Sequence, residues 1–410
     1  MRALLLLLAL ASPVAAQDFT TFKGHGGPIM GLAVAPDGQL ASASFDNALG
    51  LWSDGEPTWL DGHDAAVTAL AFDAENRLYS GSDDFSVRAW GPDQVLGQHK
   101  GKVTSIAVQG DRVASGSWDG SILLWQDGGV SELAYPGAGV NAVAWDGDAL
   151  IAATSAGVIW RYEGENRLPL AKHGFGVNRL IVGEGWLAYG AVDGGTRVID
   201  VVSGQPFKDF TLDRRPILSM AYHAETDQLA VGDGHGYIMM IDTEQWRIAR
   251  DFRAARQGPV WALAFSPDGR TIYAGGLDDV IYAWPVALLD EFDAAIDGER
   301  SFLRDAESMP NGERQFMRKC SICHALTEGP SRKAGPTLHK VFGRRAGTVP
   351  GYTYSDALTG SDIIWSDATI DALFDEGPDH YIPGSKMPMQ VIAKPSDRAD
   401  LIQYLQDATS

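Results

Sequence analysis

The feature that most limits how this 410-residue chain can fold is a repeat of about forty residues that fills its first three quarters. Each repeat contains an alternating apolar segment of the kind expected for a half-buried strand. The segments begin at Ile29, Val67, Val103, Val140, Val177, Ile217 and Val260. Their starts lie 36 to 43 residues apart, a spacing typical of repeated four-stranded units.

Four of the repeats continue with a small-residue strand, an acidic turn and a second apolar strand that ends in Trp. The turn Asp precedes the Trp by six residues in Asp46 and Trp52, Asp84 and Trp90, Asp119 and Trp125, and Asp278 and Trp284. A histidine also opens several repeats, at His25, His63, His99 and His173.

These residues resemble the WD-repeat family of β-propellers over residues 18–288. The resemblance implies that the opening His and the turn Asp hydrogen-bond through a Ser or Thr to the Trp, which fixes the blade. It therefore implies a structural role for the four opening histidines.

The three central repeats depart from this pattern. Trp160 follows a turn without Asp, and Ile199 and Ile241 replace the Trp in the next two repeats. We expect these blades to form without the polar network. His223 and His235 lie in an irregular repeat, where a role facing the channel or a ligand is the alternative to a structural one.

Ring closure explains an extra strand at the start of the repeats. One four-stranded sheet cannot bury both faces, whereas seven stacked radially bury them against their neighbours. Asp18–Phe22 forms a stray strand pattern before the first repeat and is well placed to become the outer strand of the seventh blade. The sequence thus predicts a multidomain chain that begins with an all-β, seven-bladed β-propeller over residues 17–288.

The N-terminus has the pattern of a secretory signal. Arg2 is followed by an apolar run from Ala3 to Ala11 and by small residues up to Ala16. We expect residues 1–16 to be a signal peptide cleaved after Ala16, which predicts a periplasmic protein. A membrane anchor is the alternative, but a span needs about 20 apolar residues, and no other stretch of the chain is long enough.

Charge is distributed unevenly along the chain. Residues 300–410 contain 13 basic and 14 acidic side chains, which leaves 20 basic and 39 acidic ones for the preceding residues. Such acidity argues against nucleic acid or anionic membrane surfaces as partners of the propeller. It favours a basic redox protein as the docking partner, with a generic solubility surface as the alternative.

Both cysteines of the chain lie in the motif Cys320-Ser321-Ile322-Cys323-His324. This spacing allows two thiols to add to the two vinyl groups of one haem while the following His reaches the iron. A redox dithiol would not need the His. A zinc site would need a second pair of ligands, and the chain has no other cysteines. The motif predicts one covalently attached haem c.

The residues around this motif resemble the class I cytochromes c, the short soluble type of mitochondria and related bacteria, across 309–408. The resemblance implies an all-α domain over residues 309–410, preceded by a helical connector over residues 289–308. It implies His324 and Met387 as axial iron ligands, and a Pro336 carbonyl that accepts a hydrogen bond from the ligand imidazole. It also implies haem-propionate contacts for the segments that contain Arg344, Tyr354 and Trp365.

The match to this family has three departures. One extra residue separates Trp365 from Met387, and the usual haem-packing Tyr is replaced near Leu373 and Phe374. The basic docking face is reduced, and its remaining members are Lys319, Lys333, Lys340 and Lys386. Met389 is the alternative to Met387 as ligand, with haem-pocket packing as its other role.

Three functions remain open on these grounds. The first is a periplasmic protein that transfers electrons through its haem and docks a redox partner on the propeller. The second is an oxidoreductase in which the haem feeds electrons to an active site on the propeller, an architecture similar to the nitrite reductases that join a cytochrome c domain to a propeller. The third is a scaffold whose haem senses redox state. A His/Met pair leaves no open iron position, which favours the first.

Overall fold

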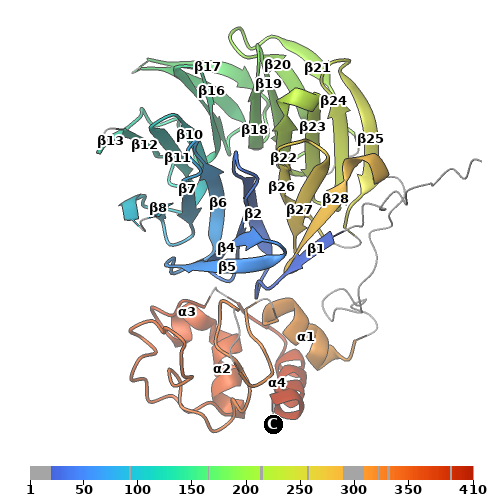
Figure 1. The fold of residues 1–410 in the computed structure, drawn as a ribbon. Coiled ribbons are helices and arrows are strands. Elements are labelled where there is room, and N and C mark those ends of the chain that lie inside the picture. The colour runs from blue at the N-terminus through green and yellow to red at the C-terminus, as the bar shows by residue number, and fades with distance from the viewer. Residues whose placement is uncertain are drawn as a thin grey trace, which may run out of the picture.

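The computed structural model describes residues 20–91, 94–126, 128–164, 166–212, 216–255, 258–289, 309–321, 323–329, 333–387 and 390–409. The predicted signal peptide, almost all of the predicted connector, and Met389 lie outside these residues. The chain forms a ring of β-sheets with a smaller helical domain beneath β1, β4 and β5 (Figure 1).

The ring contains seven four-stranded antiparallel sheets, which confirms the predicted seven-bladed propeller. The first four blades, from inner to outer strand, are β2 (Ile29–Val34), β3 (Leu40–Ser44), β4 (Ala48–Ser53) and β5 (Glu56–Asp61); β6 (Val67–Phe72), β7 (Leu78–Ser82), β8 (Ser86–Trp90) and β9 (Gln94–Gln98); β10 (Val103–Gln109), β11 (Arg112–Ser117), β12 (Ile122–Gln126) and β13 (Gly129–Glu132); and β14 (Val140–Asp146), β15 (Ala149–Thr154), β16 (Val158–Glu163) and β17 (Asn166–Lys172).

The last three blades are β18 (Val177–Gly183), β19 (Trp186–Ala191), β20 (Thr196–Asp200) and β21 (Pro206–Asp209); β22 (Ile217–His223), β23 (Gln228–Asp233), β24 (Tyr237–Asp242) and β25 (Arg247–Arg253); and β26 (Val260–Phe265), β27 (Thr271–Gly276), β28 (Val280–Pro285) and β1 (Thr20–Lys23). Short 3-10 turns cover Ala224–Thr226 and Val286–Leu288. All seven predicted inner strands begin at the predicted residues.

Neighbouring blades pack closely at a small residue that recurs in the second strand. A Cβ atom added at Gly81 would lie 2.3 Å from Cγ1 of Val103, the first residue of the next inner strand. The same clash would arise between Gly116 and Val140 at 2.5 Å. Glycine at these positions therefore lets a β-branched side chain enter the preceding blade, where it is fully buried.

The ring closes through β1, which pairs with β28 from Thr20 opposite Ala283 to Lys23 opposite Val280. The same close packing at a glycine occurs where the ring closes, because a Cβ at Gly275 would lie 2.4 Å from Cγ2 of Ile29. The predicted closing strand is confirmed from Thr20 to Phe22 and extends to Lys23, and its first two predicted residues lie outside the described part of the chain.

A buried hydrogen-bond network fixes the first blade. The Nδ1 atom of His25 donates to the Asp46 carboxylate at 2.9 Å, while Nε2 lies 2.7 Å from the Ser42 hydroxyl. The indole of Trp52 donates to the same hydroxyl at 2.7 Å. The second blade repeats this arrangement with His63, Asp84, Ser80 and Trp90. The four-residue network implied by the WD-repeat resemblance is therefore present in both blades.

The network changes in later blades. In the third, His99 contacts the hydroxyls of Ser115 and Ser121, and the Asp119 carboxylate accepts from Ser121 instead of from the ring. In the fifth, Nε2 of His173 lies 2.9 Å from Asp193. The prediction that all three central blades lack the network is therefore wrong in part, because the fifth blade keeps the His–Asp hydrogen bond. There the His–Asp pair persists although Ile199 has replaced the Trp.

His223 has a structural role. Its Nδ1 lies 2.8 Å from the Thr226 hydroxyl, and its Nε2 donates to the Pro267 carbonyl at 2.9 Å. The Nδ1 contact lies within the sixth blade, whereas the Nε2 hydrogen bond joins this blade to the seventh. His235 is exposed in the turn between β23 and β24.

The C-terminal domain contains α1 (Asn311–Lys319), α2 (Asp367–Glu376), α3 (Pro378–Tyr381) and α4 (Pro395–Thr409). The first and last helices cross closely, because a Cβ at Gly312 would lie 2.1 Å from the Asp400 carbonyl oxygen. Phe316 packs against Tyr404 at the crossing, with ring centroids 5.6 Å apart. None of the helices within the described ranges is long and apolar enough to cross a membrane.

We expect residues 17–288 to fold alone as a soluble β-rich monomer, because β1 closes the ring from within. Removing residues 17–23 should destabilise this fragment by at least about 3 kcal/mol, since Phe22 leaves its contacts with Trp52 and Tyr273. The edge of β28 should then promote aggregation. Urea unfolding and light scattering measure both effects, and Phe22→Ala separates lost packing from lost strand pairing. A truncated fragment as stable as the complete one would contradict the role given to β1.

A second prediction concerns acid stability. Burial opposes ionisation of Asp84, but the hydrogen bonds from His63 and Ser86 hold its pKa well below the usual value. A depressed folded-state pKa stabilises the fold above the unfolded value of about 4, and this stabilisation is lost as the pH falls further. Asp84→Asn should therefore cost about 1–3 kcal/mol at pH 7, and the difference from the wild type should shrink below pH 4.

Urea titrations of residues 17–288 between pH 7 and pH 2 provide the measurement. Glu75→Gln is the matched control, since it removes one negative charge from an exposed turn of the same blade. A gap between Asp84→Asn and wild type that stays constant with pH would contradict the assignment.

Candidate functional site

The cysteine motif lies where α1 ends. The amide of Cys320 donates to the Phe316 carbonyl at 2.8 Å, which completes the last helical turn. The amides of Cys323 and His324 both donate back to the Cys320 carbonyl, at 3.1 and 2.9 Å. This tight turn brings two thiols and one imidazole to the same side of the chain.

The pKa values of the two cysteine thiols bear on whether the motif is a redox dithiol. Burial, reinforced by Cys323, raises the pKa of the Cys320 thiol to about 12. Burial also raises the pKa of Cys323. Redox dithiols have a thiol with a lowered pKa, because the thiolate is the reactive form. The environment of this pair therefore disfavours a redox dithiol.

The orientation of the His324 ring is fixed by a hydrogen bond and a close contact with glycine. Its Nδ1 atom lies 2.8 Å from the Pro336 carbonyl oxygen and must donate to it, so Nε2 is the basic atom of the neutral ring. Burial lowers the pKa of His324, which keeps the ring neutral. A Cβ at Gly335 would lie 2.5 Å from Cε1 of the ring, so only glycine allows this approach.

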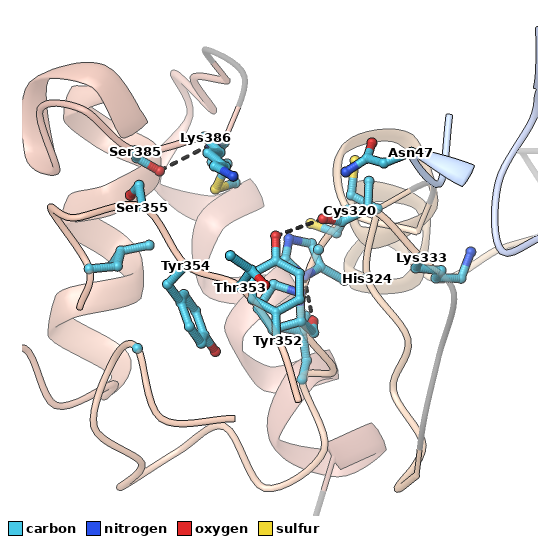
Figure 2. A pocket seen from close by; sticks show the side chains of 18 of the residues that line it. Asn47, Cys320, His324, Lys333, Tyr352, Thr353, Tyr354, Ser355, Ser385 and Lys386 are labelled. Carbon is cyan, nitrogen blue, oxygen red and sulfur yellow. Dashed lines mark hydrogen bonds between the residues drawn. The ribbon is translucent and has the colours of Figure 1, made fainter. Parts of the chain in front are cut away.

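A cavity of about 1100 Å³ lies in front of this turn and is lined by Cys320, Cys323, His324 and Met387. Figure 2 shows Cys320 and His324 on one side of it and Tyr354, Ser355 and Ser385 on the other. Its apolar walls in the helical domain come from Leu338, Val341, Leu358, Trp365, Ile370, Leu373, Phe374, Ile382 and Leu405. Leu373 and Phe374, which lie near the point where the haem-packing Tyr is missing, are buried there.

The other predicted site residues border the same cavity. Arg344 donates to the carbonyls of His339 and Thr337, both at 2.7 Å, and so holds the loop that carries Pro336. Trp365 is tied to this segment, since its amide donates to the Arg344 carbonyl at 2.9 Å. The hydroxyl of Tyr354 accepts from the Val349 amide at 3.3 Å.

Two residues that line the cavity were not among the predicted site residues. The Tyr352 hydroxyl donates to the Ala334 carbonyl at 2.7 Å, and burial raises its pKa to about 12. The buried hydroxyl oxygen of Ser355 has no hydrogen-bond partner within the described residues. A buried polar atom without a partner at an otherwise apolar wall is a group available to a ligand. Tyr352 belongs to the stretch 350–354 that resembles the propionate-binding segment, which was the only signal for it, and Ser355 directly follows that stretch.

A haem fits this set of residues. The thiols, the oriented imidazole and the methionine thioether face one mainly apolar cavity, and the unpartnered Ser355 hydroxyl offers a polar contact at its margin. These are the donor types that c-type haem sites use.

The propeller supplies the remaining wall of the cavity. Its lining residues there come from the turn between β3 and β4, the loop between β5 and β6, and the turn between β7 and β8: Phe45, Asp46, Asn47, Asp61, His63, Asp64, Ala65, Ala66, Asp83 and Asp84. Across this boundary, Nζ of Lys386 lies 3.4 Å from Oδ1 of Asp64. No pattern in the sequence indicates which blades meet the helical domain.

Comparison with known proteins separates the two parts of the chain. The family model for cytochrome c matches residues 310–409, and the model for the WD domain, G-beta repeat matches residues 17–53, 57–91, 92–126 and 247–285. The unmatched residues between 127 and 246 include the three central blades except β25, and these blades lack the turn Asp or the Trp.

Individual relatives agree with this division. The chain is 46% identical over 101 residues to a cytochrome c of Sesamum indicum, which covers 24% of this chain and 89% of the relative. It is 44% identical over 100 residues to a cytochrome c of Cochliobolus lunatus, with 24% and 90% covered.

The propeller resembles the WD40 β-propeller domain of Doa1, with a TM-score of 0.58 and 19% identity over 65% of this chain and 96% of that domain. This likeness concerns the fold alone. A cytochrome c domain implies a haem and electron transfer, and WD propellers generally mediate protein–protein contacts. The chain therefore belongs to the cytochrome c family through residues 310–409, a domain that it carries behind a seven-bladed WD-repeat β-propeller.

Proposed function

We propose that this chain is a periplasmic electron-transfer protein with one haem c, attached covalently through Cys320 and Cys323 and ligated by His324 and Met387. The observation that carries the proposal is the convergence of these four side chains on one mainly apolar cavity. When bound, the haem supplies a one-electron couple at its iron.

The chain's own residues supply the geometry. The Pro336 carbonyl orients the His324 ring and increases the basicity of Nε2, as a hydrogen-bonded partner does for any ligating imidazole. The Ser385 hydroxyl accepts from the Met387 amide at 3.1 Å and so orders the methionine loop. Because His324 and Met387 would both hold the iron, no iron position would be left for a substrate, which favours electron transfer over catalysis.

The polar residues at the cavity margin have a different role in this proposal. Tyr354, Trp365 and the unpartnered Ser355 hydroxyl would hold the haem propionates. Arg344 already donates two hydrogen bonds to backbone carbonyls. Its main contribution is therefore to fix the loop behind the ligand histidine.

The propeller would act as a docking platform for a redox protein. Exposed aromatic side chains lie on its successive turns and loops, with Trp118 59%, Tyr135 56% and Phe175 53% exposed. A Cβ at Gly120 would touch the Tyr135 ring, so this ring lies directly against the turn that carries Trp118. Apolar groups that remain exposed together on a soluble protein typically mark an interaction surface.

The periplasmic location rests on residues 1–16, whose charge, apolar run and small residues have the pattern of a cleaved signal. A haem that exchanges electrons there would serve redox partners outside the cytoplasm.

The ligand assignment predicts a spectroscopic difference between two variants. Met387→Ala should abolish the weak charge-transfer band of iron–methionine ligation in the oxidised protein, because the thioether is lost from the iron. Met389→Ala, the matched control two residues away, should retain it. Optical spectra of both oxidised variants provide the measurement, and the opposite pattern would assign the ligand to Met389.

Attachment, haem number and signal cleavage are tested together by intact mass. Protein purified from the periplasmic fraction should have the mass of residues 17–410 plus one haem, which resists denaturation and extraction. Cys320→Ser with Cys323→Ser should remove the haem mass and leave the polypeptide mass otherwise changed only by the substitutions. A wild-type mass that includes residues 1–16, or a haem lost on denaturation, would refute the corresponding part of the proposal.

A further inference from the structure

The propeller side of the haem cavity lies on one face of the ring. In each antiparallel blade, the turn between the second and third strands and the loop that leads into the next blade lie at the same end of the strands. We call this end the turn face. The propeller residues that line the haem cavity come from these turns and loops in the first and second blades. Figure 1 shows the helical domain placed beneath the strands of the first blade.

The haem cavity opens toward this turn face. Its deep walls are the apolar core of the helical domain, and the lining continues past Cys323 and Met387 to Asn47 and Asp64 of the propeller. In Figure 2, Asn47 lies on the same side of the cavity as Cys320 and Lys333. The mouth of the cavity is therefore covered by the chain's own propeller.

The two surfaces at this mouth have opposite charge. Lys319, Lys333 and Lys386 line it on the helical side, and Asp61, Asp64, Asp83 and Asp84 line it on the propeller side. Asp83 is paired with Lys102 at 2.7 Å and Asp84 belongs to the His63 network. Asp64 is the carboxylate that reaches across, 3.4 Å from the ammonium of Lys386.

Lys333 extends this complementarity to a third blade. Its ammonium donates to the Ser321 carbonyl at 2.7 Å. Burial lowers its pKa, and the carboxylates of Asp279 and Asp46 act in the opposite direction. The lysine thus lies in the field of propeller carboxylates from the seventh and first blades while it remains tied to the cysteine turn.

We propose that the acidic turn face of the first, second and seventh blades is the docking partner of this chain's own haem edge. The propeller occupies the lysine-bearing surface through which the haem would otherwise meet another redox protein. Electron exchange at this edge then requires that the contact open, and the opening becomes easier as ionic strength rises. The consequence for electron exchange rests on the proposed haem site, whereas the contact can be tested without reference to the iron.

Carbodiimide cross-linking of the full-length holoprotein tests the contact. At low salt we expect an amide bond between Asp64 and Lys386 in protein of monomer mass, identified by peptide mass spectrometry. The Lys102–Asp83 pair lies within the propeller and serves as an internal positive control. Asp64→Asn should lose the first cross-link and keep the second. Formation of the control cross-link alone in wild-type protein would overturn the proposal.

Reduction kinetics test what the contact does. The oxidised protein is mixed with a neutral hydroquinone, so that charge changes act on the contact and not on the reductant. Asp64→Lys should accelerate reduction about two- to fivefold at low salt, the range expected when an exposed ion pair becomes a repulsion. Glu75→Lys makes the same charge change at the opposite end of β6 and should leave the rate unchanged. All three proteins should converge at high salt.

Equal rates for wild type and both variants at every salt concentration would overturn the proposed covering of the haem edge, even if the cross-link forms. A failed ligand assignment is distinguishable from either result, because the iron–methionine band and the haem mass report on it separately.

Discussion

The propeller depends on one packing interaction that is repeated around the ring. The first residue of an inner strand is a buried Val or Ile, and it enters the preceding blade at a glycine in Gly81, Gly116, Gly190, Gly232 and Gly275. Two blades use alanine at this point, Ala43 before Val67 and Ala153 before Val177. Since each contact sets the approach of two sheets, the ring keeps its geometry even in the central blades whose polar networks are reduced.

The sequence predicted the parts of the fold that depend on local pattern. Seven alternating segments marked seven inner strands, and the Asp–Trp spacing marked the first three blades, which carry the full network or part of it. The seventh blade has the same spacing without an opening His, and its Asp278 accepts from the Tyr282 hydroxyl instead. The pair of His173 with Asp193 was missed because the absence of Trp at Ile199 was taken to remove the whole network. The His–Asp hydrogen bond needs only its two partners, so it survives the loss of the Ser–Trp branch.

At the site, the sequence predicted those residues that a short motif or a family pattern specifies. The cysteine turn and the Pro336 loop are local structures, so their residues come together once the helix ends at Lys319. The contact of Asp64 with Lys386 spans 322 positions and joins the propeller to the helical domain. Such a contact depends on the relative placement of rigid surfaces, which no periodicity or spacing encodes. Ser355 was missed for a similar reason, because a hydroxyl is unpartnered only in its tertiary surroundings.

The composite seventh blade has a consequence for the order of folding. The strand that is synthesised first, β1, pairs with β28, which is synthesised last within the propeller. The ring must therefore remain open, with two unpaired sheet edges, until residues near Pro285 are available. Pairing across so many residues makes closure slow relative to local hairpins, although the entropy cost grows only logarithmically with loop length. The emerging chain is consequently most vulnerable to wrong strand pairing just before its helical domain is made.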